Sequence, residues 1–297
     1  MQPHRFGRQG TVSVRTLLIS DVHLGCKHSQ AAECLRFLRS YTPQTLYIVG
    51  DFIDGWKCNK GWQWSTECDE IVALIESWIG GGVRVFYVPG NHDSFLRQQR
   101  YRRLLPEMMR SVQIADEFIF ESAHGWRFLV THGDRFDFFE TKIQWVSKGT
   151  SSLYDAILSL NWWYCWYRRA LFGQAKSFAA SSSSSLSVTT NPYAVCATLK
   201  DRVKRGVRFI SRFESSISRH ALLRGCEGVI CGHIHTPDIQ RDGQSIYLNT
   251  GDWVENCTGL VEHLDGAIHL ESAFLPPRQL VLEPHPRCRA SANDSAA

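Results

Sequence analysis

The sequence predicts an α/β fold, in which β-strands and helices alternate along the chain. Several short apolar runs rich in β-branched residues each stop at a polar cluster that contains Asp, His or Asn. Amphipathic helical stretches separate the first of these runs. The composition, with 43% hydrophobic and 21% charged residues in 297, is that of a folded globular chain and excludes disorder as the main state.

Six runs are expected to form strands, and each is followed directly by polar residues. The runs with their following clusters are 16–20 with Asp21-Val-His23, 45–49 with Gly50-Asp-Phe-Ile-Asp54, 83–88 with Pro89-Gly-Asn-His-Asp93, 127–130 with Thr131-His-Gly-Asp134, 228–231 with Gly232-His-Ile-His235, and 245–248 with Asn249-Thr-Gly-Asp252. Ligands of open α/β sheets bind outside the carboxyl ends of the strands. We therefore expect these clusters to contribute to one site.

Two helices are expected between the early strands. Residues 30–40 place Ala31, Cys34, Leu35 and Leu38 on one face, and residues 68–79 place apolar residues such as Ile71 on another. The strand, polar loop, helix, strand order is typical of an α/β sheet.

A long interval separates the fourth and fifth clusters, and we interpret residues 141–226 as an insertion. It contains the aromatic stretch 161–169, the serine run 181–185 and a basic helical stretch, 199–210. Residues 14–285 are expected to form the main domain. Residues 1–13 and 286–297 are expected to be flexible tails.

The insertion carries a large net positive charge, unlike the rest of the chain. It contains thirteen Lys or Arg residues and only three acidic residues, although the formal net charge of the whole chain is only +4. The basic residues, including Lys204 and Arg208, form either a solvated helix face or a surface for a diphosphate or anionic lipid headgroups. The segment has no recognisable nucleic-acid-binding motif, so no nucleic acid is expected as a partner.

The aromatic stretch has two interpretations. Trp162, Trp163 and Trp166, together with nearby Tyr residues, form either the buried face of a helix or a surface for an acyl chain or membrane interface. Adjacent helical residues point about 100° apart, so one core contact does not bury them all. We take the three Trp residues with Arg168, Arg169, Lys204 and Arg208 as candidate substrate-binding residues.

The expected location is the cytoplasm. No apolar run reaches the roughly 18 residues of a membrane span, and the first residues lack the apolar core of a signal peptide. The ten cysteines show no CxxC spacing and are expected to be reduced.

The polar clusters predict a metal centre. Seven side chains offer imidazole nitrogen, carboxylate or carboxamide oxygen: Asp21, His23, Asp51, Asn91, His132, His233 and His235. This mixed nitrogen and oxygen set suits Mn, Fe or Zn better than Mg. Seven ligands exceed what one ion needs if a position stays open for substrate, so we expect two divalent cations, with Mn²⁺ as the preferred metal.

Two cations bridged by one carboxylate favour a particular chemistry. Ions about 3.5–4 Å apart clamp the attacking and leaving oxygens of an in-line phosphoryl displacement and lower the pKa of a shared water. His92, next to the ligand Asn91, is then available as an acid for the leaving oxygen.

The ordered blocks Asp-x-His, Gly-Asp-x-x-Asp, Gly-Asn-His-Asp, His-Gly-Asp and Gly-His-x-His, from Asp21 to His235, resemble the signature of the calcineurin-like metallophosphoesterases. The resemblance implies a four-layer α/β/β/α sandwich with a dinuclear centre. It assigns Asp21, His23, Asp51 and His235 to the first metal, and Asp51, Asn91, His132 and His233 to the second, with Asp51 as the bridge. It implies that His92 stabilises the transition state or donates a proton, oriented by Asp54 or Asp93.

The stretches 47–57, 231–237 and 247–255 are similar to the UDP-2,3-diacylglucosamine hydrolase branch. Those enzymes cleave a UDP-linked, doubly acylated sugar to the lipid monophosphate and UMP in lipid A synthesis. They carry a helical lid at the place of the insertion. The aromatic and basic residues of the insertion here predict peripheral contact with the anionic inner face of the cytoplasmic membrane. The best-described members have Arg where this chain has His92.

Two other functions remain open from the sequence. The His92 variant is the general phosphoesterase form, which favours a phosphodiesterase or phosphatase for a nucleotide or a phosphoprotein. A scaffold without catalysis is the other reading, although no ligand is missing. The sequence leaves open whether Asp252, Trp253 and Glu255 cap a loop or line the site.

Overall fold

The computed structural model describes residues 10–57, 61–103, 107–136, 213–242 and 245–287. By the proximity of its Cα atoms the chain divides into two units, residues 1–137 with 212–297, and residues 138–211. The second unit, with the candidate substrate-binding residues of the insertion, lies outside the described residues, as do most of both predicted tails.

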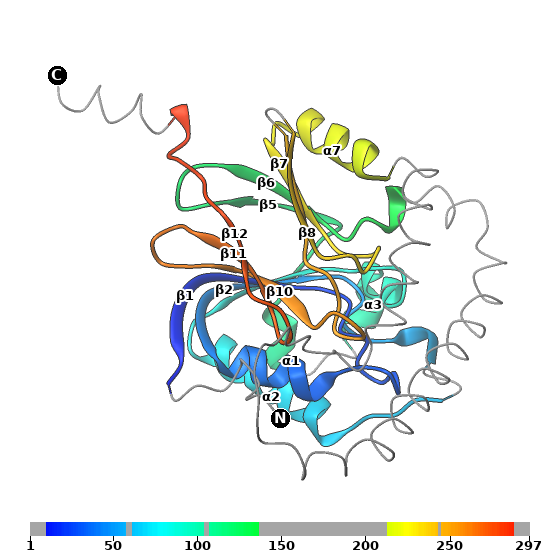
Figure 1. Ribbon diagram of the computed structural model, residues 1–297. Coiled ribbons are helices and arrows are strands. Elements are labelled where there is room, and N and C mark those ends of the chain that lie inside the picture. Colours follow the sequence, from blue (N-terminus) through cyan, green and yellow to red (C-terminus); the bar gives the residue numbers. More distant parts are fainter. Residues whose placement is uncertain (1–9, 58–60, 104–106, 137–212, 243–244, 288–297) are drawn as a thin grey trace, which may run out of the picture. The chain divides into compact units, whose positions relative to one another are not determined.

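The larger of two sheets has seven strands in the order β12-β11-β10-β1-β2-β3-β4 (Figure 1). Strands β1, β2, β3 and β4 are parallel, whereas β10, β11 and β12 join antiparallel. The strands are β1 (Val12–Ile19), β2 (Tyr41–Val49), β3 (Arg84–Val88), β4 (Gln113–Ile114), β10 (Thr258–Glu262), β11 (Ile268–Ser272) and β12 (Arg278–Leu280).

The second sheet has five strands in the order β5-β6-β7-β9-β8. Its inner strands β6, β7 and β9 are parallel, so their carboxyl ends lie at the same edge. The strands are β5 (Glu117–Glu121), β6 (Arg127–Thr131), β7 (Gly228–Cys231), β8 (Asp238–Asp242) and β9 (Ser245–Asn249).

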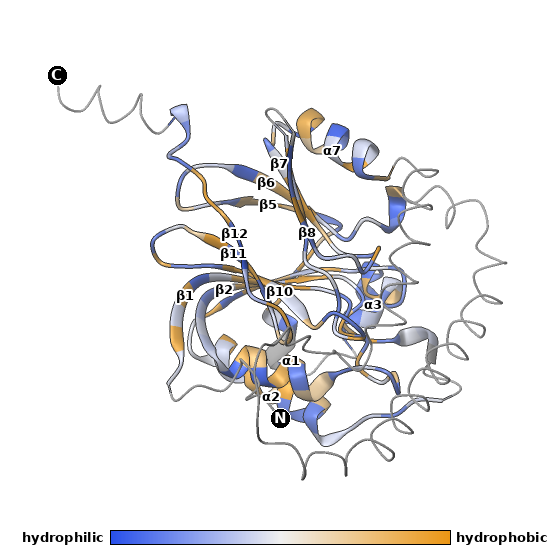
Figure 2. Ribbon diagram, in the orientation of Figure 1, coloured by the Kyte–Doolittle hydropathy of each residue, from blue (hydrophilic) through white to orange (hydrophobic). Residues whose placement is uncertain are grey.

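Helices cover the outer face of each sheet (Figure 1). Helices α1 (Ala31–Arg39) and α2 (Thr66–Gly80) pack on the larger sheet, and α7 (Phe213–Leu223) packs on the smaller one. Figure 2 shows apolar and polar residues alternating along these helices, as amphipathic packing requires. The shorter helices are α3 (Gln99–Arg102) and the 3₁₀ turns Gly55–Lys57, Ser94–Arg97, Met108–Ser111 and Asp134–Phe136.

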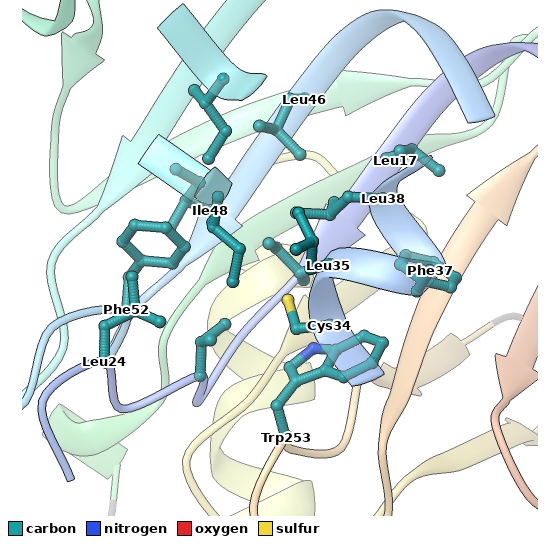
Figure 3. Close-up of a cluster of buried hydrophobic side chains, with 14 of the residues drawn as sticks. Leu17, Leu24, Cys34, Leu35, Phe37, Leu38, Leu46, Ile48, Phe52 and Trp253 are labelled. Carbon is teal, nitrogen blue, oxygen red and sulfur yellow. The ribbon is translucent and has the colours of Figure 1, made fainter. Parts of the chain in front are cut away.

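Three separate clusters of buried apolar side chains lie between the four layers. The first joins α1 and α2 to the larger sheet and includes Phe37 and Trp253 (Figure 3). The second lies between the sheets, where Leu18 and Val49 of one sheet face Val130 of the other. The third joins α7 to the smaller sheet. The predicted α/β/β/α sandwich is therefore confirmed.

The predicted strands and helices match observed ones within a few residues, with one informative difference. Strand β2 begins at Tyr41, four residues before the predicted start, although it contains Pro43. Pro43 pairs with β1, but β3 joins β2 only from Thr45 onward. The missing N–H of Pro43 therefore lies where β2 has one neighbour, a position that tolerates proline.

The last part of the predicted insertion contributes to the layers themselves. Phe213, Ile217 and Ala221 of α7 are buried against Leu129 and Val229 of the second sheet. Residues 213–226, which the sequence assigned to the insertion, thus belong structurally to the first unit.

Candidate metal centre

The predicted ligands come from loops at the carboxyl ends of parallel strands in both sheets. In the larger sheet, Asp21 and His23 follow β1, Asp51 follows β2 and Asn91 follows β3. In the smaller sheet, His132 follows β6, and His233 and His235 follow β7. Each half of the site is therefore built on a separate sheet, and the packing of the sheets brings the halves together.

One group of ligand atoms joins Asp21, His23 and His235. The Nε2 atom of His235 lies 3.0 Å from Asp21 Oδ1, and the Nε2 atom of His23 lies 3.9 Å from the same oxygen. The two Nε2 atoms are 3.4 Å apart. One potential ligand atom from each residue lies within 4.8 Å of the others, so a single cation fits the group with small adjustments.

A second group joins Asp21, Asp51 and His132. The Nε2 atom of His132 lies 3.4 Å from Asp51 Oδ2 and 3.2 Å from Asn91 Oδ1. The Nδ1 atom of His132 donates to the Val49 carbonyl oxygen, at 2.9 Å. This bond holds the ring with Nε2 toward the two oxygens, in the manner of outer partners that orient metal-binding histidines.

His233 lies beside the second group. Its ring centroid is 5.2 Å from that of His132, and its backbone N–H donates to Asp21 Oδ2 at 3.0 Å. Asp21 itself belongs to both groups of potential ligands, so in this geometry it lies between them. The bridging role of Asp51 stays a prediction.

The donor set fits cations in a specific respect. Asp21 is fully buried, and its Oδ2 atom accepts hydrogen bonds from Ser20 Oγ and the His233 backbone. Its Oδ1 atom is buried, and the Nε2 atoms of His235 and His23 lie 3.0 and 3.9 Å from it. A buried carboxylate is costly unless positive charge lies next to it. Asp51 and Asp54 are also buried here, so cations would compensate the negative charge of more than one buried carboxylate.

The backbone at the ligands is unusual. Among the described residues six non-glycine residues have positive φ, and five of them are Asp21, His23, Asp51, His233 and His235, with φ between 49° and 67°. Left-handed backbone is unfavourable for such residues and concentrates at functional sites. At these five residues, the left-handed conformation turns the chain sharply at the strand end and directs the side chains toward the site.

Gly90 shows why a small residue is needed beside the ligands. A Cβ atom at this position would collide with Asp51 Oδ1 and would lie 2.7 Å from His132 Nε2. Gly90 therefore allows the backbone to approach the second ligand group closely.

The electrostatics of the site favour positive charge. Burial alone would raise the pKa of Asp51, but His132 and His92 lower this pKa well below its usual value. Burial likewise opposes protonation of His132, yet Asp51 raises the pKa of His132 well above its usual value. Burial, together with His92, lowers the pKa of His23 to about 4, so His23 is a neutral imidazole, the form that binds a metal.

His92 lies at the edge of the first group and is oriented by Asp54. Its Nδ1 atom is 2.9 Å from Asp54 Oδ1, and its ring contacts that of His23 edge to face at a centroid distance of 4.6 Å. Asp93, the other orienter considered, instead accepts hydrogen bonds from the backbone N–H groups of Phe52 and Gly90, at 2.8 and 2.6 Å. Asp93 thus holds the loops in place.

Sequence reasoning missed two neighbours of the site. Trp56 stacks on His92 with ring centroids 3.9 Å apart, and Ser20 binds the Asp21 carboxylate. Trp56 follows the Gly-Asp-x-x-Asp block by two residues, which was the available signal.

Asp252 caps a loop, because its Oδ1 atom accepts from the N–H groups of Val254 and Glu255, and Trp253 lies in the core.

No helix within the described ranges is long and apolar enough to cross a bilayer. The candidate residues Trp162, Trp163, Trp166, Arg168, Arg169, Lys204 and Arg208 lie outside those ranges, so their contact with substrate stays a prediction.

Comparison with known proteins agrees with this site. Residues 14–237 match the family described as calcineurin-like phosphoesterase. A UDP-2,3-diacylglucosamine hydrolase of Xanthomonas axonopodis pv. citri is 26% identical over 266 residues, which is 85% of this chain and 96% of the relative. A protein of the same name from Neisseria meningitidis is 35% identical over 121 residues, 39% of this chain and 47% of the relative.

A solved structure of a Vps29 mutant from Entamoeba histolytica shows 10% identity and a TM-score of 0.43, over 90% of this chain and 99% of that chain. The family match covers the ligand blocks from Asp21 to His235. The chain belongs to the calcineurin-like phosphoesterase family and is a hydrolase of phosphoester or diphosphate bonds.

Proposed function

We propose that this protein is a dinuclear-metal hydrolase that cleaves the diphosphate of UDP-2,3-diacylglucosamine to the lipid monophosphate and UMP, in lipid A synthesis. The observation that carries the proposal is the pair of ligand groups that share Asp21, with the His92 and Asp54 pair beside them. The proposed substrate is that of the UDP-2,3-diacylglucosamine hydrolase of Xanthomonas axonopodis pv. citri, 96% of which aligns with this chain.

The side chains of the site would hold two divalent cations, for which Mn²⁺ is the proposed metal. Asp21, His23 and His235 would bind one, while Asp51, His132 and Asn91, with His233, would bind the other. When bound, two such cations neutralise charge on the diphosphate and make hydroxide available near neutral pH.

His92 would donate a proton to the leaving oxygen. Its Nδ1 atom is engaged by Asp54, which leaves Nε2 on the opposite side of the ring for the substrate. Burial opposes protonation of the ring, but Asp51 and Asp54 raise the pKa of His92 above its usual value. Trp56 restricts rotation of the ring by stacking on it. A proton from His92 assists the departure of the leaving oxygen.

The insertion would bind the lipid part of the substrate. We propose that Trp162, Trp163 and Trp166 contact acyl chains, and that Arg168, Arg169, Lys204 and Arg208 contact the diphosphate or anionic headgroups. These contacts would bring the enzyme to the inner face of the cytoplasmic membrane.

The test is release of UMP from UDP-2,3-diacylglucosamine in mixed micelles with Mn²⁺. We expect Asp51→Asn and His132→Ala to lose at least about 100-fold in activity, because each removes a ligand. Glu121→Gln is the matched control, since Glu121 is exposed on β5. Full activity in either ligand variant would overturn the mechanism.

A second candidate, a phosphodiesterase or phosphatase for soluble esters, is favoured by His92. The same preparation should be assayed with cyclic nucleotides, aryl phosphates and a phosphopeptide. Turnover of these substrates, with no release of UMP from the lipid substrate, would replace the lipid assignment while keeping the metal mechanism.

A further inference from the structure

A second cluster of metal-binding side chains lies on the hairpin of β10 and β11. His263, His269 and Glu271 each offer a ligand atom, and these atoms lie within 4.8 Å of one another. The rings of His263 and His269 are 4.6 Å apart at their centroids. None of the three residues belongs to the phosphoesterase blocks.

The register of the hairpin explains why these side chains meet. His269 lies opposite Val261, and Glu271 lies opposite Gly259. The pairing continues one step past β10, because the His263 N–H donates to the Ala267 carbonyl oxygen. His263 is thus the diagonal neighbour of His269, within reach on the same face of the sheet. Ile268 and Leu270 point the other way, into the core between the sheets.

The polar atoms of this cluster lack ordinary partners. The Nε2 atoms of both histidines are buried and make no hydrogen bond with the described residues. The Nδ1 atom of His269 lies 3.5 Å from Glu271 Oε1, longer than the roughly 2.7–3.2 Å of an N–H···O hydrogen bond. Buried polar atoms without protein partners are rare, and a bound water or an ion is the usual explanation.

The spacing suits a tetrahedral zinc ion. Ligand bonds of about 2.0–2.1 Å in a tetrahedron place ligand atoms roughly 3.4 Å apart. The 3.5 Å between His269 Nδ1 and Glu271 Oε1 is close to that edge length, which makes Nδ1 the ligand atom of His269 and leaves its Nε2 atom outside the zinc coordination. Two imidazoles and one carboxylate are a ligand set that zinc accepts, with a water in the fourth position.

The cluster is remote from the catalytic centre. Glu262, next to His263, pairs with Thr16, which precedes Asp21 by five residues on β1. β1 ends at Ile19, so the strand part of this separation, from Thr16 to Ile19, corresponds to about 10 Å. An ion at the hairpin would therefore leave the phosphoesterase ligands unchanged.

We propose that His263, His269 and Glu271 form a separate zinc site that ties β10 to β11 and stabilises this part of the seven-stranded sheet. The ion would be bound by residues that come from the end of one strand and the interior of the next. Zinc bound only to the native hairpin stabilises the folded state by mass action.

The test uses the full-length protein, stripped with a chelator and dialysed against buffered free Zn²⁺. Bound zinc is measured by elemental analysis, and the unfolding midpoint is measured with and without zinc. We expect His263→Gln/His269→Gln to bind one equivalent fewer than the unsubstituted protein. His285→Gln is the control, because His285 lies near a single carboxylate, with 3.8 Å between its Nε2 and Glu227 Oε1.

Glu271→Gln keeps the proposal testable if the double variant does not fold. We expect it to weaken zinc binding at the hairpin by at least about tenfold, since ligand loss costs no less than loss of an outer partner. Equal zinc content and equal zinc-dependent stabilisation in the unsubstituted protein and Glu271→Gln would overturn the proposal.

Discussion

The His92 imidazole and the Asp54 carboxylate are paired, with Nδ1 and Oδ1 2.9 Å apart, although 38 residues separate them in sequence. Asp54 follows β2 and His92 follows β3, two parallel neighbours whose carboxyl ends lie at one edge of the sheet. The pair lies next to His23, so an ionisable group outside the two metal groups is fixed beside them.

We expect His92→Ala to lower kcat by about 100- to 10,000-fold, the usual contribution of a general acid. Asp54→Asn should lower kcat less, with little change in KM, because Asp54 acts through His92. In the His92→Ala background Asp54→Asn should have almost no effect. Steady-state kinetics on the four proteins tests this, and additive losses would contradict an orienting role for Asp54.

Gly90→Ala is expected to abolish activity and reduce Mn²⁺ binding while the protein stays folded. The added Cβ would collide with Asp51 and displace it from the second ligand group. Gly81→Ala is the control, because the Cβ there meets only backbone oxygens at 3.4 Å. Metal analysis and circular dichroism distinguish the outcomes, and normal metal content in Gly90→Ala would contradict the geometry.

Trp253→Ala is expected to lower the free energy of unfolding by about 3–5 kcal/mol, because it removes a fully buried aromatic side chain. The indole packs on Phe37 with ring centroids 5.1 Å apart (Figure 3). Trp253→Phe should cost less, since the Trp253 N–H has no partner among the described residues. Urea unfolding measures both values, and an equal cost would contradict a role in packing.

Removal of metal is expected to destabilise the fold. The cations would compensate the buried carboxylates Asp21 and Asp51, and binding at 100 times Kd contributes about 2.7 kcal/mol per site. Addition of Mn²⁺ to chelator-treated protein should therefore raise the unfolding midpoint. Asp51→Asn should respond less, and an identical response in the two proteins would count against Asp51 as a ligand.

Glu262→Gln tests a pH dependence far from the catalytic site. Burial raises the pKa of Glu262, despite hydrogen bonds from the Ala123 N–H and the Thr16 hydroxyl. The folded protein thus holds this proton more tightly than the unfolded chain, so the carboxyl costs stability as pH rises above its usual pKa of 4.5. Glu262→Gln should gain stability relative to the unsubstituted protein as pH rises from 4.5. Urea unfolding across this pH range measures the effect, with Glu121→Gln as the control. A difference in the free energy of unfolding between Glu262→Gln and the unsubstituted protein that does not change with pH would contradict the prediction.

The residue pattern was sufficient for an α/β fold and for the positions of the polar clusters, whereas the four layers were expected only from the family resemblance. Strand-forming runs such as 228–231 are short, apolar and bounded by glycine, and parallel pairing brings their ends to one edge. Six strands escaped prediction, because none leads into a polar cluster of the repeated kind: β4, β5, β8, β10, β11 and β12. Helix α7 was included in the insertion, since its apolar positions 213, 217 and 221 form only a weak stripe.

The finer geometry of the site required coordinates. Asp54 and Asp93 are both candidates in sequence, at 38 residues and 1 residue from His92, and only the loop conformation decides between them. The stacking of Trp56 on His92 depends on the turn at Gly55–Lys57, for which no residue pattern was recognised. Left-handed backbone at five ligands is likewise a property of the folded loops.

The thickness of the apolar layer between the two sheets affects the distance between metal ligands on opposite sheets. Val49 lies two residues before Asp51, and Val130 lies two residues before His132, while both side chains belong to that layer. The bulk of these aliphatic groups sets how far apart the sheets stand, and with it the span between opposing donor atoms. A substitution at Val49 or Val130 that removes or adds a methyl group would therefore change the reaction rate without altering any residue that contacts an ion or a phosphate.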